Sequence, residues 1–248
     1  MRDGASGPRG SHAGTPATGA QHALPPTDLL VLGAHAPDLR GLRDRLGTRL
    51  VGRIQNLEVL GKVVGVGGAV AAAATMRRLL LVEPRVAVLV GTCGVYAGCE
   101  GYRPKDVVVS QSCALVSFSV AAGRAAFPDP LRTRLEAPAH LVAGLRASGA
   151  RVHAAGVASP QAFTLDDALA ATVPGSHGCE AENLEAFAVA QACESAGIPF
   201  AAVLGVTHVV GSTAGDDRRR FAKEASEAAF EVVASWLRAG APGLPAPR

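Results

Sequence analysis

The sequence contains few aromatic side chains, which make up 4% of its 248 residues. Its core must therefore be built from Ala, Val and Leu, within a hydrophobic fraction of 48%. That composition suits a sheet covered by alanine-rich helices. No uncharged apolar run reaches the roughly 18 residues that a membrane-spanning helix needs, so we expect no membrane partner.

The sequence also lacks a strong charge of either sign and lacks paired cysteines. Its net charge is +3, from 24 basic and 21 acidic side chains, which is too small to predict a nucleic-acid partner. The five cysteines form no CxxC pair, and no Cys/His cluster has the spacing of metal ligands, so we expect no metal. An odd number of unpaired cysteines is typical of a reduced compartment and predicts a cytoplasmic protein.

Composition divides the chain into three parts. Residues 1–27 contain no apolar signal segment and too few apolar side chains to fold, so they predict a disordered tail. Residues 28–238 predict one large domain. Residues 239–248 are rich in Pro, Gly and Ala and predict a loose C-terminal tail.

Within the domain, short apolar runs alternate with helical patterns, which predicts an α/β fold. Runs without a polar residue are typical of strands buried on both faces of a mainly parallel sheet. The expected strands are 29–32, 86–90, 106–110, 152–157 and 200–206, with one or two more in 57–66 around a turn at Gly61-Lys62. The expected helices are 37–46, 69–81, 131–147, 181–196 and 218–237.

Three of the expected strands end in polar or glycine-rich sequence, at residues 33–38, 91–94 and 207–208. Ligands of open α/β sheets bind beyond the carboxyl ends of the strands, so these segments predict a site. A fourth feature is Glu185, which has apolar neighbours on an expected helix. A carboxylate in such surroundings is costly unless it is paired, and two adjacent hydroxyls of a substrate would pair with it well.

These features, in this order, resemble the purine nucleoside phosphorylase/uridine phosphorylase superfamily, and most of all its methylthioadenosine/S-adenosylhomocysteine nucleosidases. The resemblance covers about residues 29–238 and implies a three-layer α/β/α sandwich with a central mixed sheet. The stretches that carry it are Leu32-Gly33-Ala34 with Asp38, Gly65-Val66-Gly67 with Ala72, Val90-Gly91-Thr92-Cys93-Gly94 with Asp106-Val107-Val108-Val109, and Asn183-Leu184-Glu185-Ala186 with Pro199-Phe200 and Gly205-Val206-Thr207-His208.

The resemblance also implies how a nucleoside would be held. Glu185 stands where the family binds the ribose 2′ and 3′ hydroxyls, although a helix Glu that faces solvent is the alternative. Leu184 takes the place of a Met beneath the sugar. Thr92 is expected to contact the ribose, the attacking water or phosphate. The residues expected to line the base pocket are Cys93 and Gly94, through their backbone, and Phe163, by stacking on the base.

The segment 33–38, which follows the first expected strand, bears on whether water or phosphate is the nucleophile. A phosphorylase must neutralise a phosphate dianion, usually with arginines, and Leu89 stands where the family's bacterial phosphorylases carry an Arg. Arg40 lies two residues beyond the natural alignment, which falls on Asp38. The nucleosidases carry a Glu at this position that activates water. Asp38 is shorter, and it is also a suitable first-turn acid of a helix. We expect hydrolysis without a cofactor; phosphorolysis, with inorganic phosphate as co-substrate, is the alternative.

His208 departs from the family pattern. Purine-specific members carry an Asp there that gives a proton to purine N7. An imidazole can be a proton donor near neutral pH, so His208 is expected to be the general acid. Two alternatives are selection of a different base, such as a 6-oxopurine, and loss of catalysis in a nucleoside-binding protein. The polar segment 211–217 is either a lid or a simple loop.

The family usually forms dimers or trimers, and a neighbouring subunit often completes the site. We therefore expect a homodimer or homotrimer. His35 and residues near Phe118 are candidates for facing such a neighbour. The expected partner is otherwise a small-molecule nucleoside.

Overall fold

A computed structural model describes residues 27–246. The expected tail at 1–27 lies outside the described residues except for Thr27. The strands are β1 (Leu29–Gly33), β2 (Val51–Ile54), β3 (Leu57–Val63), β4 (Val86–Val95), β5 (Val107–Leu115), β6 (Arg134–Glu136), β7 (Val152–Ser159), β8 (Ala181–Glu182) and β9 (Phe200–Val209). The helices are the 3₁₀ helix η1 (Ala36–Leu39), α1 (Arg40–Leu46), α2 (Gly68–Val82), α3 (Phe118–Ala121), α4 (Ala139–Arg146), α5 (Asp167–His177), α6 (Ala186–Ser195) and α7 (Ala214–Arg238).

The strands form one mixed sheet, as expected. Strand β1 pairs in parallel with β3 and β4, and β4 pairs in parallel with β9. Strand β9 then runs antiparallel to β5, which is parallel to β7. The short β8 joins β7 back to β4, so this half of the sheet closes on itself. Because β1, β4 and β9 are parallel, their carboxyl ends meet at one edge.

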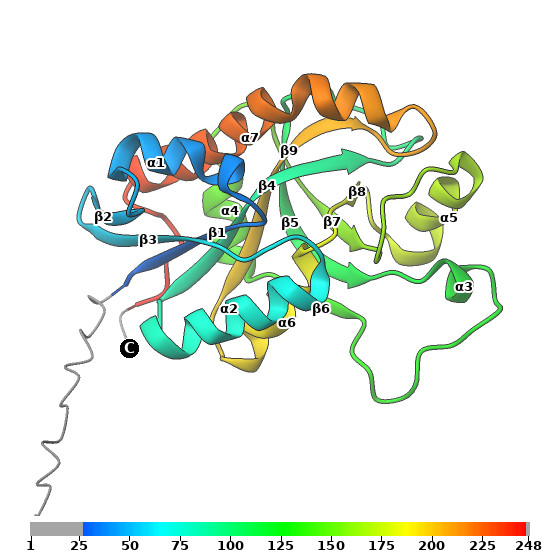
Figure 1. Cartoon of the computed structure of the whole chain (residues 1–248), viewed down its shortest axis with the longest axis horizontal. Coiled ribbons are helices and arrows are strands. Elements are labelled where there is room, and N and C mark those ends of the chain that lie inside the picture. The colour runs from blue at the N-terminus through cyan, green and yellow to red at the C-terminus, as the bar shows by residue number, and fades with distance from the viewer. Residues whose placement is uncertain (1–26, 247–248) are drawn as a thin grey trace, which may run out of the picture.

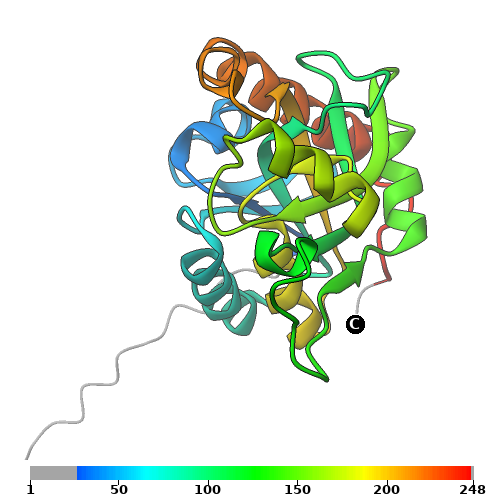
Figure 2. The same cartoon turned by 90° about the vertical axis from the view of Figure 1, so that its right-hand side faces the viewer.

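Helices cover both faces of the sheet, which confirms the three layers (Figures 1 and 2). Alternate residues of β1 belong to different cores because successive side chains of a strand point to opposite faces. Leu30 and Leu32 pack in the cluster that contains α2 and α6. Leu29 and Val31 pack in the cluster that contains α1, α4 and α7.

The expected helix at 131–147 is wrong in its first half. Residues 134–136 form β6, which pairs antiparallel with β5, and α4 begins only at Ala139. Pro138 is the residue before the helix and has an extended ψ of 123°. A proline disfavours the helical conformation of the residue before it, so the helix cannot extend backwards from α4.

The expected helix at 181–196 also begins later. Residues 181–182 form β8, and the side chain of Asn183 accepts hydrogen bonds from the backbone N–H groups of Glu185 (3.0 Å) and Ala186 (2.9 Å). An Asn at a helix start satisfies N–H groups that have no partner inside the helix. Helix α6 therefore starts at Ala186, and Glu185 lies at its N-cap.

Three smaller expectations also change. Residues 57–63 form a single strand that pairs with the unforeseen β2, without a turn at Gly61-Lys62. Helix α7 begins at Ala214, so 214–217 are helical and not part of a loop. The segment after α7 is held against the domain: Ala241 is buried, and Arg85 donates to the carbonyl of Pro245 at 2.9 Å. None of the helices in the described part is long and apolar enough to cross a bilayer.

Candidate active site

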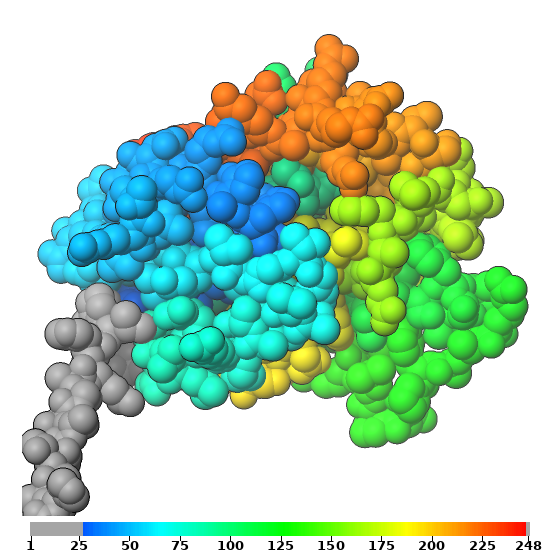
Figure 3. Space-filling view, viewed as in Figure 1, coloured from blue at the N-terminus to red at the C-terminus, as the bar shows by residue number. Residues whose placement is uncertain are grey.

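A cavity of about 600 Å³ opens at the carboxyl ends of β1, β4 and β9. Figure 3 shows this hollow between α7, the segment around η1 and the start of α2. The structure brings all eight residues predicted for the site to its walls. They are Asp38, Thr92, Cys93, Gly94, Phe163, Leu184, Glu185 and His208.

Asp38 is presented by η1, directly after β1 ends at Gly33, and is 4% exposed. Its Oδ2 accepts hydrogen bonds from the backbone N–H of His35 at 3.0 Å and from His35 Nδ1 at 2.6 Å. Burial raises the pKa of Asp38, and the contacts with His35 oppose that rise. A carboxylate with a raised pKa is a better proton acceptor near neutral pH. Asp38 can therefore deprotonate a water molecule in the cavity.

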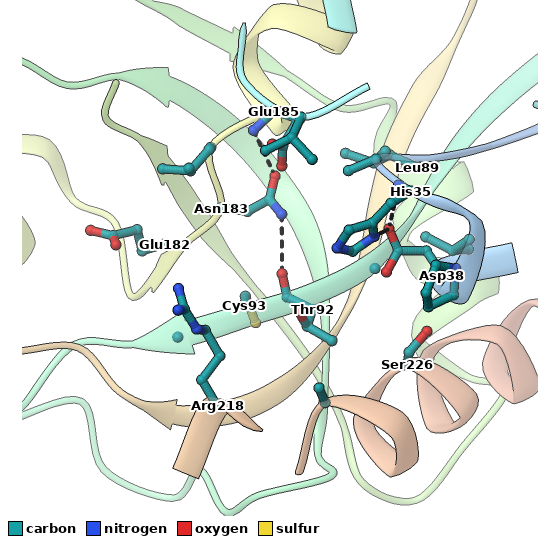
Figure 4. A pocket seen from close by; sticks show the side chains of 18 of the residues that line it. His35, Asp38, Leu89, Thr92, Cys93, Glu182, Asn183, Glu185, Arg218 and Ser226 are labelled. Atoms are coloured by element: carbon teal, nitrogen blue, oxygen red, sulfur yellow. Dashed lines mark hydrogen bonds and ion pairs between the residues drawn. The ribbon is translucent and has the colours of Figure 1, made fainter. Parts of the chain in front are cut away.

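Glu185 is 5% exposed and turns its carboxylate into the cavity (Figure 4). Oε1 accepts a hydrogen bond from the backbone N–H of Gly67 at 2.8 Å. Gly67 has a φ of 89°, a conformation that favours glycine. Burial raises the pKa of Glu185, the negative charge of Asp38 raises it further, and the Gly67 bond opposes both. A carboxylate held in this way is a strong acceptor for hydroxyl donors.

Asn183 connects the two walls that carry Thr92 and Glu185. Its Nδ2 donates to the carbonyl of Thr92 at 3.0 Å, while its Oδ1 holds the N–H groups at the start of α6 (Figure 4). Ser159 Oγ in turn donates to the Asn183 carbonyl at 2.7 Å. This network fixes β4 relative to Glu185. Asn183 is not among the predicted site residues, although an Asn just before Glu185 is typical of a residue that caps a helix start.

The segment at 91–94 is part of β4 and not a loop. Cys93 pairs with Val206 of β9, but the next pair is Gly94 with His208, so the register shifts and Thr207 has no partner in the ladder. The shift places the imidazole against Gly94. A Cβ at Gly94 would lie 2.7 Å from His208 Nε2, so only glycine leaves room for the ring.

Thr207 holds the imidazole of His208 in place. The Thr207 hydroxyl lies 3.1 Å from the carbonyl of Cys93, to which it can donate. It also lies 2.6 Å from His208 Nδ1, a contact in which either atom can hold the proton. Burial, with the positive charge of Arg218, lowers the pKa of His208 to about 4. The ring is therefore largely neutral near neutral pH, and as a general acid it would have to donate from the nitrogen that carries its single proton; the role of His208 as general acid stays a prediction.

Phe163 and Arg218 form the wall next to His208. Phe163 is 49% exposed, and the guanidinium of Arg218 lies 4.2 Å from the centre of its ring. The arginine run of α7 reads from sequence as a solvated helix start, but Arg218 and Arg219 line the cavity. Arg220 instead lies over Phe221, away from the cavity lining.

Comparison with known proteins identifies the family of the chain. The model of the phosphorylase superfamily matches residues 23–238. The chain belongs to this superfamily. A search of curated proteins by sequence finds no match.

Solved structures of superfamily members have the same fold. A methylthioadenosine/S-adenosylhomocysteine nucleosidase from Neisseria meningitidis, in complex with methylthio-immucillin-A, has a TM-score of 0.76 at 21% identity over 86% of this chain and 99% of that one. The corresponding nucleosidase from Colwellia psychrerythraea, in complex with adenine, has a TM-score of 0.78 at 16% identity over 90% and 98%. Futalosine hydrolase from Helicobacter pylori has a TM-score of 0.76 at 14% identity over 86% and 98%.

The basic side chains that line the cavity are Arg40, Arg218, Arg219 and Lys223. Leu89 faces the cavity, and Arg40, which also lines it, lies 3.5 Å from Glu227. No three His, Cys, Asp or Glu side chains between residues 27 and 246 are placed to hold a metal ion.

Proposed function

We propose that the protein hydrolyses the N-glycosidic bond of a purine-type nucleoside. The observation that carries this proposal is the pair of buried carboxylates, Asp38 and Glu185, which face the same cavity. Membership in the phosphorylase superfamily supports it. Nucleosidases and a futalosine hydrolase among the similar structures also favour hydrolysis.

Each carboxylate has a separate task in this proposal. Glu185 accepts hydrogen bonds from the ribose hydroxyls and orients the sugar. Asp38 accepts a proton from water while the water oxygen forms a bond to C1′. The C1′–N bond breaks, and its electron pair leaves with the base. The sugar passes through an oxocarbenium-like state, whose positive charge is stabilised by two nearby carboxylates.

The same charges favour water over phosphate as the nucleophile. A phosphate dianion beside C1′ would meet the negative charges of Asp38 and Glu185. Arginines usually neutralise such a dianion. Position 89 is a Leu, Arg40 is paired with Glu227 and Arg219 with Asp216, and Arg218 lies over the ring of Phe163. Water carries no charge and only needs an acceptor, which Asp38 supplies.

A panel of purine nucleosides, assayed with and without phosphate, tests the proposal. We expect free base and free ribose, with no effect of phosphate on the rate. Formation of ribose 1-phosphate would establish a phosphorylase instead. Binding of nucleosides without release of base would show a non-catalytic binding protein. Asp38→Asn should lose activity, while Asp44→Asn, on the exposed side of α1, is the matched control.

We also propose that the chain forms a homo-oligomer, a homodimer or homotrimer. One side of α2 and the residues before it expose Val66, Val70, Leu80 and Leu81, and exposed apolar patches of this kind mark protein interfaces. Light scattering should give a multiple of the 25.1 kDa chain mass. Leu80→Glu should lower that mass to one chain, whereas Leu131→Glu, at an exposed position elsewhere, should not.

A cytoplasmic location is the third part of the proposal. The structure contains five free cysteines, four of them buried, which is typical of proteins from reducing compartments. Cell fractionation should find the protein with cytoplasmic markers, and recovery from the secreted or envelope fraction would contradict the proposal.

A further inference from the structure

We propose that Arg218 and His208 together recognise the edge of the leaving base and select a 6-oxopurine over a 6-aminopurine. The inference rests on the proposed function, because it assumes that a purine occupies this end of the cavity. It concerns the identity of the base, which Asp38 and Glu185 do not contact in the proposed function.

The first step concerns the protons of His208 and Glu182, which both line the cavity. In this proposal His208 carries its proton on Nδ1, 2.6 Å from the Thr207 hydroxyl, and presents Nε2 to the base as an acceptor. Glu182 is 5% exposed. Glu182 already accepts hydrogen bonds from Tyr96 Oη at 2.9 Å and from both the backbone N–H and the hydroxyl of Thr164.

The second step is that Arg218 offers donors that no carboxylate has taken. Within residues 27–246 it forms no ion pair, whereas the adjacent Arg219 is paired with Asp216. The side chain of Arg218 projects from α7 into the cavity (Figure 4), and its guanidinium lies over the ring of Phe163. Arg218 and His208 line the same cavity, and the positive charge of Arg218 contributes to lowering the pKa of His208.

The third step compares the donors and acceptors of the two purines. A guanidinium presents two parallel N–H donors, and His208 Nε2 adds an acceptor. The edge of a 6-oxopurine offers N7 and O6 as adjacent acceptors, followed by an N1–H donor. An Arg fork matches N7 and O6 with two hydrogen bonds. In a 6-aminopurine, N7 is an acceptor, the 6-amino group is a donor and N1 is an acceptor. The amino N–H would therefore face one of the two Arg N–H donors, and no hydrogen bond can form there.

This arrangement also lets the base leave without a general acid at position 208. When the C1′–N9 bond breaks, the electron pair stays on the base, and the negative charge spreads to N7 and O6. The fixed positive charge of Arg218 stabilises that anion at the moment it forms. The base then takes its proton from solvent after it leaves. No proton has to come from His208.

Matched nucleosides test the inference. We expect kcat/KM to be about tenfold or more higher for inosine than for adenosine, the discrimination of one good bidentate pair. Arg218→Met keeps the side-chain length but removes the donors, and it should reduce the preference to about twofold or less. Arg218→Lys keeps the charge without the fork and should also lose most of the preference. Arg220→Met, on the same helix but outside the cavity lining, should keep the wild-type preference.

Binding of the free bases separates this inference from the proposed function. Calorimetry should show tighter binding of hypoxanthine than of adenine, and the difference should disappear in Arg218→Met. If no nucleoside is cleaved but this binding difference is found, the proposed function fails and the inference stands. Equal or better use of adenosine, or a preference that survives in Arg218→Met, overturns the inference whether or not hydrolysis occurs.

Discussion

Acid should destabilise the folded protein through His208. The pKa of this imidazole falls from 6.5 to about 4, chiefly because it is buried and secondly because Arg218 is near. Between these values the unfolded chain binds a proton that the folded protein excludes, so stability is lost as pH falls through this window. At about 1.4 kcal/mol per pKa unit, the full loss is about 3 kcal/mol, of which about 2 kcal/mol falls between pH 7 and pH 5.

Denaturant unfolding of the wild type and of His208→Asn at pH 7, 6 and 5 measures this loss. The amide nitrogen of Asn stands where Nδ1 stands in His and can still donate to Thr207. Asp38 and Glu185 have raised pKa values and act in the opposite direction, so the difference between the two proteins isolates the imidazole. We expect the wild type to lose about 2 kcal/mol more than the variant between pH 7 and pH 5.

An exposed histidine of α4 supplies the control. His140→Asn removes an imidazole from the surface and should retain the pH dependence of the wild type. The reasoning is refuted if His208→Asn has the same pH dependence as the wild type. It is equally refuted if the nuclear magnetic resonance signal of His208 titrates near pH 6.5, because the ring would then be charged near neutral pH and Nε2 would not be an acceptor.

Three further predictions concern the cavity. Glu185→Gln should lower kcat/KM about 10- to 100-fold, because a charge-assisted acceptor is lost. It should also raise the Tm at pH 7, because burial penalises the charged carboxylate. An unchanged kcat/KM would show that Glu185 does not bind the ribose. Asp38→Asn should lower kcat about 100-fold or more with little change in KM. In the wild type, the rate should fall on acidification at a pH above the ordinary carboxyl range, because burial raises the pKa of Asp38. A rate that does not change with pH in that range would contradict the role of Asp38 as the base. Gly94→Ala should destabilise the fold by about 1–3 kcal/mol in denaturant unfolding and should raise KM. The reason is that the Cβ of the alanine would lie 2.7 Å from both His208 and Val210. A variant as stable as the wild type would contradict this close packing.

The sequence predicts the central strands well because they are buried on both faces. Such strands contain continuous apolar runs, and 29–32, 86–90 and 200–206 all lie inside β1, β4 and β9. Their ends are harder to place. Strands β4 and β9 continue through Thr92 and through Thr207-His208, where polar side chains interrupt the apolar pattern. Backbone pairing between the two strands extends them, and that pairing depends on tertiary structure.

Candidate residues could be predicted where a strand end or an out-of-place charge marks them. Glu185 is an example, since a carboxylate among apolar neighbours needs a reason. Arg218 is the opposite case, because three arginines after two aspartates are typical of a solvated helix start. The sequence does not tell which side of α7 faces the cavity, so it cannot separate Arg218 from Arg220. Asn183 lies between these cases: its place at a helix start can be read from the sequence, but its bond to Thr92, 91 positions away, depends on the fold.

The proposed reaction separates charge, because cleavage of a glycosidic bond leaves positive charge on the sugar and negative charge on the base. In the proposal Asp38 and Glu185 face the sugar, while Arg218 and a neutral His208 face the base; all four line the one cavity. A carboxylate in place of His208 would have to be protonated to help an anionic base leave, whereas a fixed guanidinium is always charged. The departure from the family pattern at position 208 is therefore compatible with catalysis, because in the proposal Arg218 offsets the negative charge of the leaving base that an acid at position 208 would otherwise neutralise.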